Sequence, residues 1–108
     1  MLRVILESPY AGDIERNTTY ARRAVRDSLS RNEAPIASHL LYTQPGILRE
    51  EITHERAAGI AAGLTWLNVA EKMIVYTDYG ISGGMKNAIY QAKNRRLSIE
   101  YRQIGENP

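Results

Sequence analysis

The residues Ser8-Pro9-Tyr10-Ala11-Gly12-Asp13 have the types and spacing of a ligand-binding loop. The loop follows an apolar run at 2–6, typical of a strand buried on both faces, and precedes a helical pattern that Asp13 can cap. Strand ends, loop amides and the positive end of a helix converge at the ligand sites of open α/β sheets. Ser8, Tyr10, Gly12 and Asp13 are therefore predicted to contact a small anionic ligand.

A second loop of this kind spans residues 78–84 and begins with Asp78. Ser82 is the predicted N-cap of the helix that follows it. The free amides of Gly83 and Gly84, with Met85 beside them, could bind a phosphate or a carboxylate. The alternative is a tight turn that binds nothing.

A third segment, residues 38–44, follows a short strand and is predicted to be irregular. Its side chains include His39 and Tyr42, both of which could contact a ligand at the same edge of a sheet. A histidine in this position can instead be hydrogen-bonded to backbone, and Tyr10 can be a half-buried loop aromatic. These alternatives remain open on the sequence alone.

The pair Glu55-Arg56 lies in the first turns of a predicted helix at 49–69. The two side chains either point toward the ligand or belong to a solvated face. Zinc hydrolysis is not expected from His54-Glu55, because Ala58 stands where His-Glu-x-x-His needs its second histidine. We predict no metal and no cofactor.

Strand patterns alternate with helical patterns along the chain, which predicts a parallel sheet with right-handed crossovers. The expected fold is a flavodoxin-like, Rossmann-like α/β arrangement of about four strands, with the three loops at its carboxyl edge. Gly59 and Gly63 predict that a sheet or a symmetry-related helix packs closely against the second helix. The predicted strands occupy 2–6, 34–37, 72–77 and 97–104, and the predicted helices 14–32, 49–69 and 83–95.

Composition limits the class of protein. The 108 residues suit one domain at 1–104 with a tail at 105–108, and a net charge of +2 argues against a nucleic-acid partner. The chain has no cysteine, which excludes disulfides and thiolate metal sites. No apolar run approaches the roughly 20 residues that span a membrane, and no secretory signal is evident, so we expect a cytoplasmic protein.

Taken together, these residues resemble a phage and bacterial family related to nucleoside 2-deoxyribosyltransferases and 2'-deoxynucleoside 5'-phosphate N-hydrolases. The resemblance implies a flavodoxin-like fold, a nucleotide pocket at the carboxyl edge, and homo-oligomers whose neighbours help to complete the pocket. The matching features are Ser8-Pro9-Tyr10-x-Gly12-Asp13 with Arg16-Asn17, Pro35-Ile36-Ala37-x-His39-Leu40-Leu41, Glu55-Arg56 with Gly59 and Gly63-Leu64, and Ile81-Ser82-x-Gly84-Met85 with Ala92.

The chain departs from the catalytic relatives at two positions. Where the resemblance implies a nucleophilic glutamate the chain has Ala88, and where it implies an assisting aspartate it has Gly63. We therefore predict binding of a nucleotide-derived small molecule without turnover. A phage-type protein of this kind could sequester an ADP-ribose-like or cyclic nucleotide signal of host defence, in the host cytoplasm. The alternative is an N-glycosidase or deoxyribosyltransferase with a relocated carboxylate, for which Asp13, Asp78 and Glu55 are the candidates.

Overall fold

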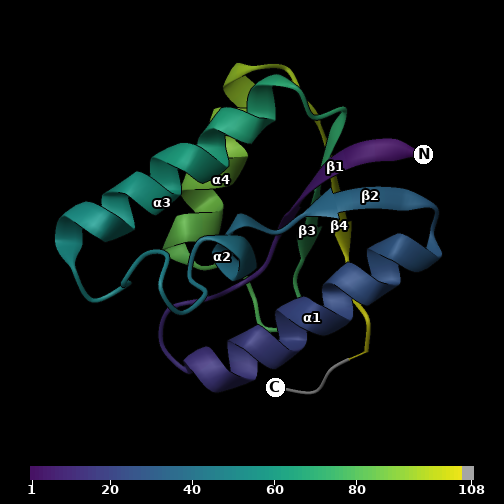
Figure 1. The fold of residues 1–108 in the computed structure, drawn as a ribbon. Coiled ribbons are helices and arrows are strands. Elements are labelled where there is room, and N and C mark those ends of the chain that lie inside the picture. Colours follow the sequence, from purple (N-terminus) through teal and green to yellow (C-terminus); the bar gives the residue numbers. More distant parts are fainter. Residues whose placement is uncertain (106–108) are drawn as a thin grey trace.

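The computed structural model describes residues 1–105 and contains a four-stranded parallel sheet with helices on both faces (Figure 1). The strand order is β2-β1-β3-β4, which confirms the predicted open α/β sheet of flavodoxin-like type. Apart from Gly105, the predicted tail lies outside the described residues. The elements are β1 (Leu2–Glu7), α1 (Ile14–Ser30), β2 (Glu33–Ile36), α2 (Ser38–Leu41), α3 (Thr53–Thr65), a 3-10 turn η1 (Trp66–Asn68), β3 (Lys72–Tyr76), α4 (Gly83–Asn94) and β4 (Ser98–Arg102).

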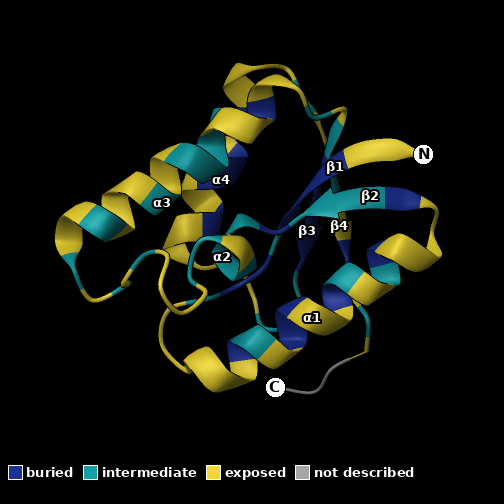
Figure 2. Ribbon diagram, viewed as in Figure 1, coloured by how far each residue is buried: buried dark blue, intermediate teal, exposed yellow. Residues whose placement is uncertain are grey.

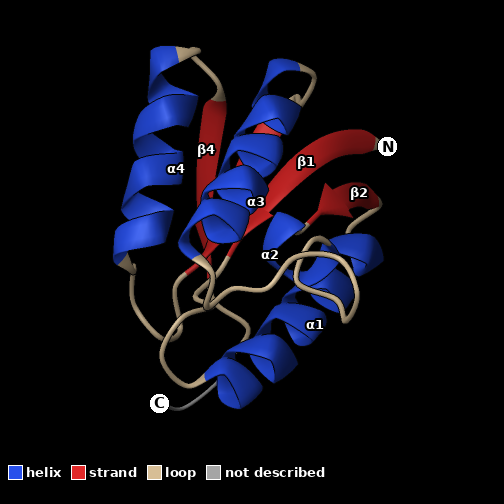
Figure 3. Ribbon diagram, turned by 60° about the vertical axis from the view of Figure 1, so that its left-hand side comes forward, coloured by secondary structure: helices blue, strands red, loops and turns tan. Residues whose placement is uncertain are grey.

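The two central strands, β1 and β3, are covered by helices on both faces. This explains why their sequences are nearly continuous apolar runs. On β1, Val4 and Leu6 pack in one core cluster with α1, whereas Ile5 packs in the other with η1 and α4. On β3, Ile74 packs in the cluster with α1, and Met73 packs in the cluster with η1 and α4. Figure 2 shows these buried strands between the helical layers, and Figure 3 shows α3 and α4 together on one side of the sheet.

The second predicted helix is shorter than expected at both ends. Ile52 has an extended backbone and precedes α3, so the helix begins at Thr53 rather than Arg49. At the other end the Trp66 amide bonds both the Gly63 and Leu64 carbonyls, and the chain tightens into η1. The segment predicted to be irregular contains the single-turn helix α2.

The glycines of α3 admit close neighbours from α2 and the loop after it, rather than from the sheet. A Cβ on Gly63 would lie 2.5 Å from Ser38 Oγ, and one on Gly59 would lie 3.3 Å from Leu48 Cδ1. Both neighbours belong to α2 and the loop after it. Across the described part of the chain, no helix is long and apolar enough to cross a membrane.

A buried ion pair joins the two edge strands on the α1 face. Arg102 of β4 donates two hydrogen bonds to Glu33 of β2, at 2.8 Å to Oε1 and 2.6 Å to Oε2. Both residues are buried, and the Arg102 hydrogen bonds hold the pKa of Glu33 below its usual range. Ser28 also donates to Glu33 at 2.8 Å. Arg102 is further hydrogen-bonded to Glu100.

Replacing Glu33 with glutamine should lower the free energy of unfolding by about 3 kcal/mol, because a buried arginine loses one of its two carboxylate partners. Urea unfolding followed by circular dichroism measures this change. The control is Glu51→Gln, which removes an exposed partner of Arg49 and should leave the midpoint nearly unchanged. Equal midpoints for the two variants would contradict a stabilising role for the buried pair.

Candidate functional site

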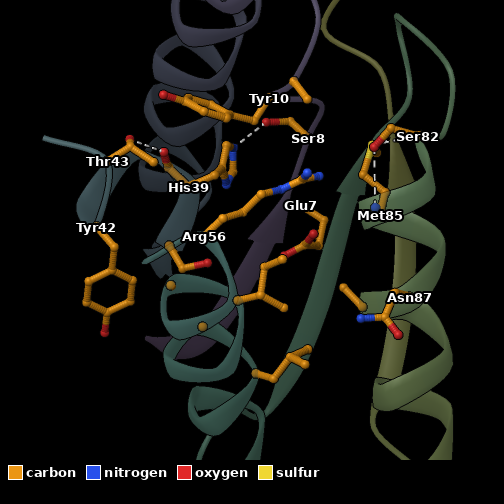
Figure 4. Close-up of a pocket in the computed structure, with 18 of the residues that line it drawn as sticks. Glu7, Ser8, Tyr10, His39, Tyr42, Thr43, Arg56, Ser82, Met85 and Asn87 are labelled. Carbon is orange, nitrogen blue, oxygen red and sulfur yellow. Dashed lines mark hydrogen bonds between the residues drawn. The ribbon is translucent and has the colours of Figure 1, made fainter. Parts of the chain in front are cut away.

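A cavity of about 360 Å³ lies between α3 and α4, over the carboxyl half of β1 and Met73 of β3 (Figure 4). Its walls are the loop after β1, the α2 segment, α3 and the first turns of α4. The volume is near the lower end of the range usual for small-molecule sites, about 300–1,000 Å³. This is the sheet edge at which the sequence predicts a ligand.

The loop after β1 is held in place by Asn17 of α1. The buried Asn17 side chain donates hydrogen bonds to the Tyr10 carbonyl at 2.9 Å and to the Ala11 carbonyl at 3.1 Å. Asp13 caps the same helix by accepting from the Arg16 amide at 3.1 Å, as predicted. The loop is thus fixed by α1 itself, which positions Ser8 and Tyr10 at the cavity.

Ser8 and His39 share a hydrogen bond of 2.7 Å between Oγ and Nε2. Burial lowers the pKa of His39 to about 4, so the imidazole is neutral at pH 7. Tyr10 meets His39 edge to face, with 6.4 Å between the ring centroids. The pair offers a ligand neutral hydrogen-bonding groups rather than a positive charge.

The wall formed by α3 and the preceding loop carries the charges of the site. The Arg56 side chain extends from α3 across the cavity toward the end of β1 (Figure 4). Its Nε lies 3.3 Å from Glu50 Oε1. Glu55 accepts a hydrogen bond from the Arg49 amide at 3.0 Å. One cation is therefore directed into the cavity, while both neighbouring carboxylates have partners.

The opposite wall is the N-terminus of α4. Ser82 caps the helix by accepting from the Met85 amide at 3.3 Å. The amides of Gly83 and Gly84 belong to the first turn of α4, where amides have no partner within the helix. Among the described residues neither donates a backbone hydrogen bond elsewhere, and nothing lies within 4 Å of a Cβ built on either glycine. Ala88, one turn further on, is buried and also lines the cavity.

Glu7 is one of the polar cavity residues that sequence reasoning missed, the others being Ser38, Thr43, Glu50 and Asn87. It is the last residue of β1 and points into the cavity (Figure 4). Burial raises the pKa of its carboxyl to about 8, and among the described residues its side chain makes no hydrogen bond or ion pair. The sequence did offer one indication of this position. Side chains alternate between the two faces of a strand, so Glu7 lies on the same face of β1 as Ile5.

The chain belongs to a family defined as a domain of unknown function (DUF7768), whose model matches residues 2–102. No curated protein and no solved structure matches the chain. Membership in the DUF7768 family carries no activity with it, so the interpretation of the cavity depends on its geometry.

Ten of the thirteen residues predicted to contact a ligand line the cavity of this DUF7768 domain. Among them, Tyr42 lies at its margin with its ring turned away (Figure 4), and its hydroxyl accepts a hydrogen bond from Trp66 at 2.8 Å. The ten are Ser8, Tyr10, His39, Tyr42, Glu55, Arg56, Ser82, Gly83, Gly84 and Met85.

Gly12, Asp13 and Asp78 are the three that do not line the cavity. Gly12 has a φ of 98° in the turn before α1, where Asp13 is the cap. Asp78 accepts hydrogen bonds from the Ile104 amide at 3.0 Å and the Gly105 amide at 2.9 Å. Asp13 and Asp78 thus hold the fold together away from the cavity.

Replacing Glu7 with glutamine should stabilise the protein, and increasingly so as the pH rises. The folded state keeps a proton on Glu7 up to about pH 8, whereas the unfolded state loses it near the ordinary pKa of 4.5. The unfolded state therefore binds fewer protons between these values, and the wild-type chain loses stability as the pH rises. At pH 7 the gain from Glu7→Gln should be about 3 kcal/mol.

Thermal unfolding at about pH 5 and about pH 7 checks this prediction. The gain should fall to about 1 kcal/mol at the lower pH. A gain that is equal at both pH values would show that Glu7 is ionised in the folded protein.

Proposed function

We propose that the cavity binds a nucleotide-derived small molecule and holds it without turnover. One observation carries the proposal: the Arg56 cation and the open amides of α4 face each other across a cavity with an apolar interior. A phosphate would bind to the Arg56 cation and the α4 amides, and an aromatic base would fill the apolar interior. The resemblance to nucleotide-processing proteins supports the same ligand class.

The state of the carboxylates that line the cavity supports the proposed absence of turnover. Glu50 is bound by Arg56, and Glu55 by the Arg49 amide. Glu7 is neutral at pH 7, and a protonated carboxyl is not a nucleophile. Ala88 and Gly63 stand where the resemblance implies catalytic carboxylates. There is little room at the second, because a Cβ on Gly63 would already press on Ser38.

A protein that binds a nucleotide without cleaving it removes that nucleotide from solution. The biological role that we propose is therefore sequestration of a nucleotide signal, with an ADP-ribose-like or cyclic compound as the ligand.

Calorimetric titration with ADP-ribose and with deoxynucleoside monophosphates should detect binding to the wild-type chain. Arg56→Gln should weaken it about tenfold or more, because a charge-assisted hydrogen bond contributes about 1.5–3 kcal/mol. Arg22→Gln, an exposed position on α1, removes the same charge and should change nothing.

Two results would contradict the proposal. If none of these nucleotides binds, the ligand class is wrong. If chromatography shows free base released from a bound deoxynucleotide, the site turns over its ligand and the relocated-carboxylate alternative is favoured.

A further inference from the structure

Glu7 is the polar side chain that the sheet contributes to the cavity lining. The charged groups Arg56, Glu50 and Glu55 come from α3 and the loop before it, whereas the other lining residues of the sheet are the apolar Ile5 and Met73. Further apolar lining residues come from the helices: Leu64 from α3, Leu67 from η1 and Ala88 from α4. Glu7 is therefore the polar group on the otherwise apolar floor that the sheet forms.

The Glu7 carboxyl faces the cavity without a partner from the described chain. The residue is half-buried, so its carboxyl is accessible from the cavity. Within residues 1–105 it makes no hydrogen bond or ion pair, and Arg56 forms its ion pair with Glu50 instead. A polar group that makes no internal contact and lines a cavity is a candidate for direct contact with the ligand.

Protonation decides what this group can recognise. A neutral carboxyl presents one O–H donor and one carbonyl acceptor side by side, whereas an ionised carboxylate presents acceptors only. The neutral form matches an acceptor that lies beside a donor. The ring nitrogen and the neighbouring amino group of adenine or cytosine form such an edge.

We propose that Glu7 binds the edge of a nucleobase, its O–H donating to a ring nitrogen while its carbonyl oxygen accepts from the neighbouring amino group. This inference rests on the proposed function and adds the orientation of the ligand to it. The base lies inward against the apolar floor, and the phosphate lies outward, near Gly83, Gly84 and Arg56. Glu7 is then the residue that holds the base.

The proposal predicts that binding is lost at alkaline pH. Ionised Glu7 no longer donates to the ring nitrogen, so binding should weaken as the pH rises through about 8. His39 does not interfere, because its pKa of about 4 leaves it neutral throughout. The other titratable groups of the cavity lining are Tyr10 on the β1 loop, Tyr42 after α2, and Glu50, Glu55 and Arg56 on the α3 side; none comes from β3 or α4.

The test is calorimetric titration with AMP and CMP at about pH 7 and about pH 9.5, an interval in which neither base titrates. Wild-type affinity should fall about 30-fold across this interval, which follows from a single proton with a midpoint near 8. Glu7→Gln keeps an adjacent donor and acceptor, and should bind at both pH values with no such fall. Glu7→Ala should bind at least about tenfold more weakly than wild type at pH 7.

Arg56→Gln is the matched control, since it weakens the phosphate end and should keep the 30-fold ratio between the two pH values. If wild type, Glu7→Gln and Glu7→Ala bind equally and without pH dependence, the role of Glu7 is overturned and the proposed function stands. If neither nucleotide binds to wild type at pH 7, the role of Glu7 is overturned; the proposed function falls with it only when ADP-ribose and the deoxynucleoside monophosphates also fail to bind.

Discussion

The coverage of β1 on both faces is the constraint on which the site depends. Because β1 pairs with β2 on one side and β3 on the other, its register and its two faces are fixed. Each of its side chains must then enter one helical layer or the other. Val4 and Leu6 enter the α1 layer, and the next residue, Glu7, must enter the opposite one. There the cavity between α3 and α4 receives it.

The two glutamates on opposite faces of the sheet differ in their partners and their charge. On the α1 face, Glu33 is ionised and is bound by Arg102, which links the edge strands. On the cavity face, Glu7 has no partner among the described residues and is neutral at pH 7. The first arrangement stabilises the fold. The second costs stability, and a cost of this kind is typical of groups that contact ligands.

The fold could be predicted because its signals are local. Apolar runs bounded by glycine, proline and capping residues marked the central strands, and Asp13 and Ser82 both cap helices as expected. The cavity walls could also be predicted, because parallel strands bring their following loops to one edge. The short helix α2 could not, since a single turn carries no periodicity.

The remaining features depend on contacts between residues distant in sequence. The missing side chain of Gly63 leaves room for Ser38, and Asp78 accepts a hydrogen bond from the Ile104 amide, which follows β4. Neither partner can be found from the residues nearby. Glu7 was missed for another reason: a charged residue after an apolar run resembles the beginning of a loop, although here it is the last residue of the strand. Its neutrality is a consequence of burial, which only the packed structure reveals.

Carbon-13 NMR of the Glu7 side-chain carboxyl tests this account most directly. In the free protein its chemical shift should titrate with a midpoint near pH 8. Saturating AMP should raise that midpoint further, because a ligand that prefers the protonated form must favour protonation in return. A midpoint near 4.5 that does not respond to AMP would contradict both the neutral carboxyl and its contact with the base.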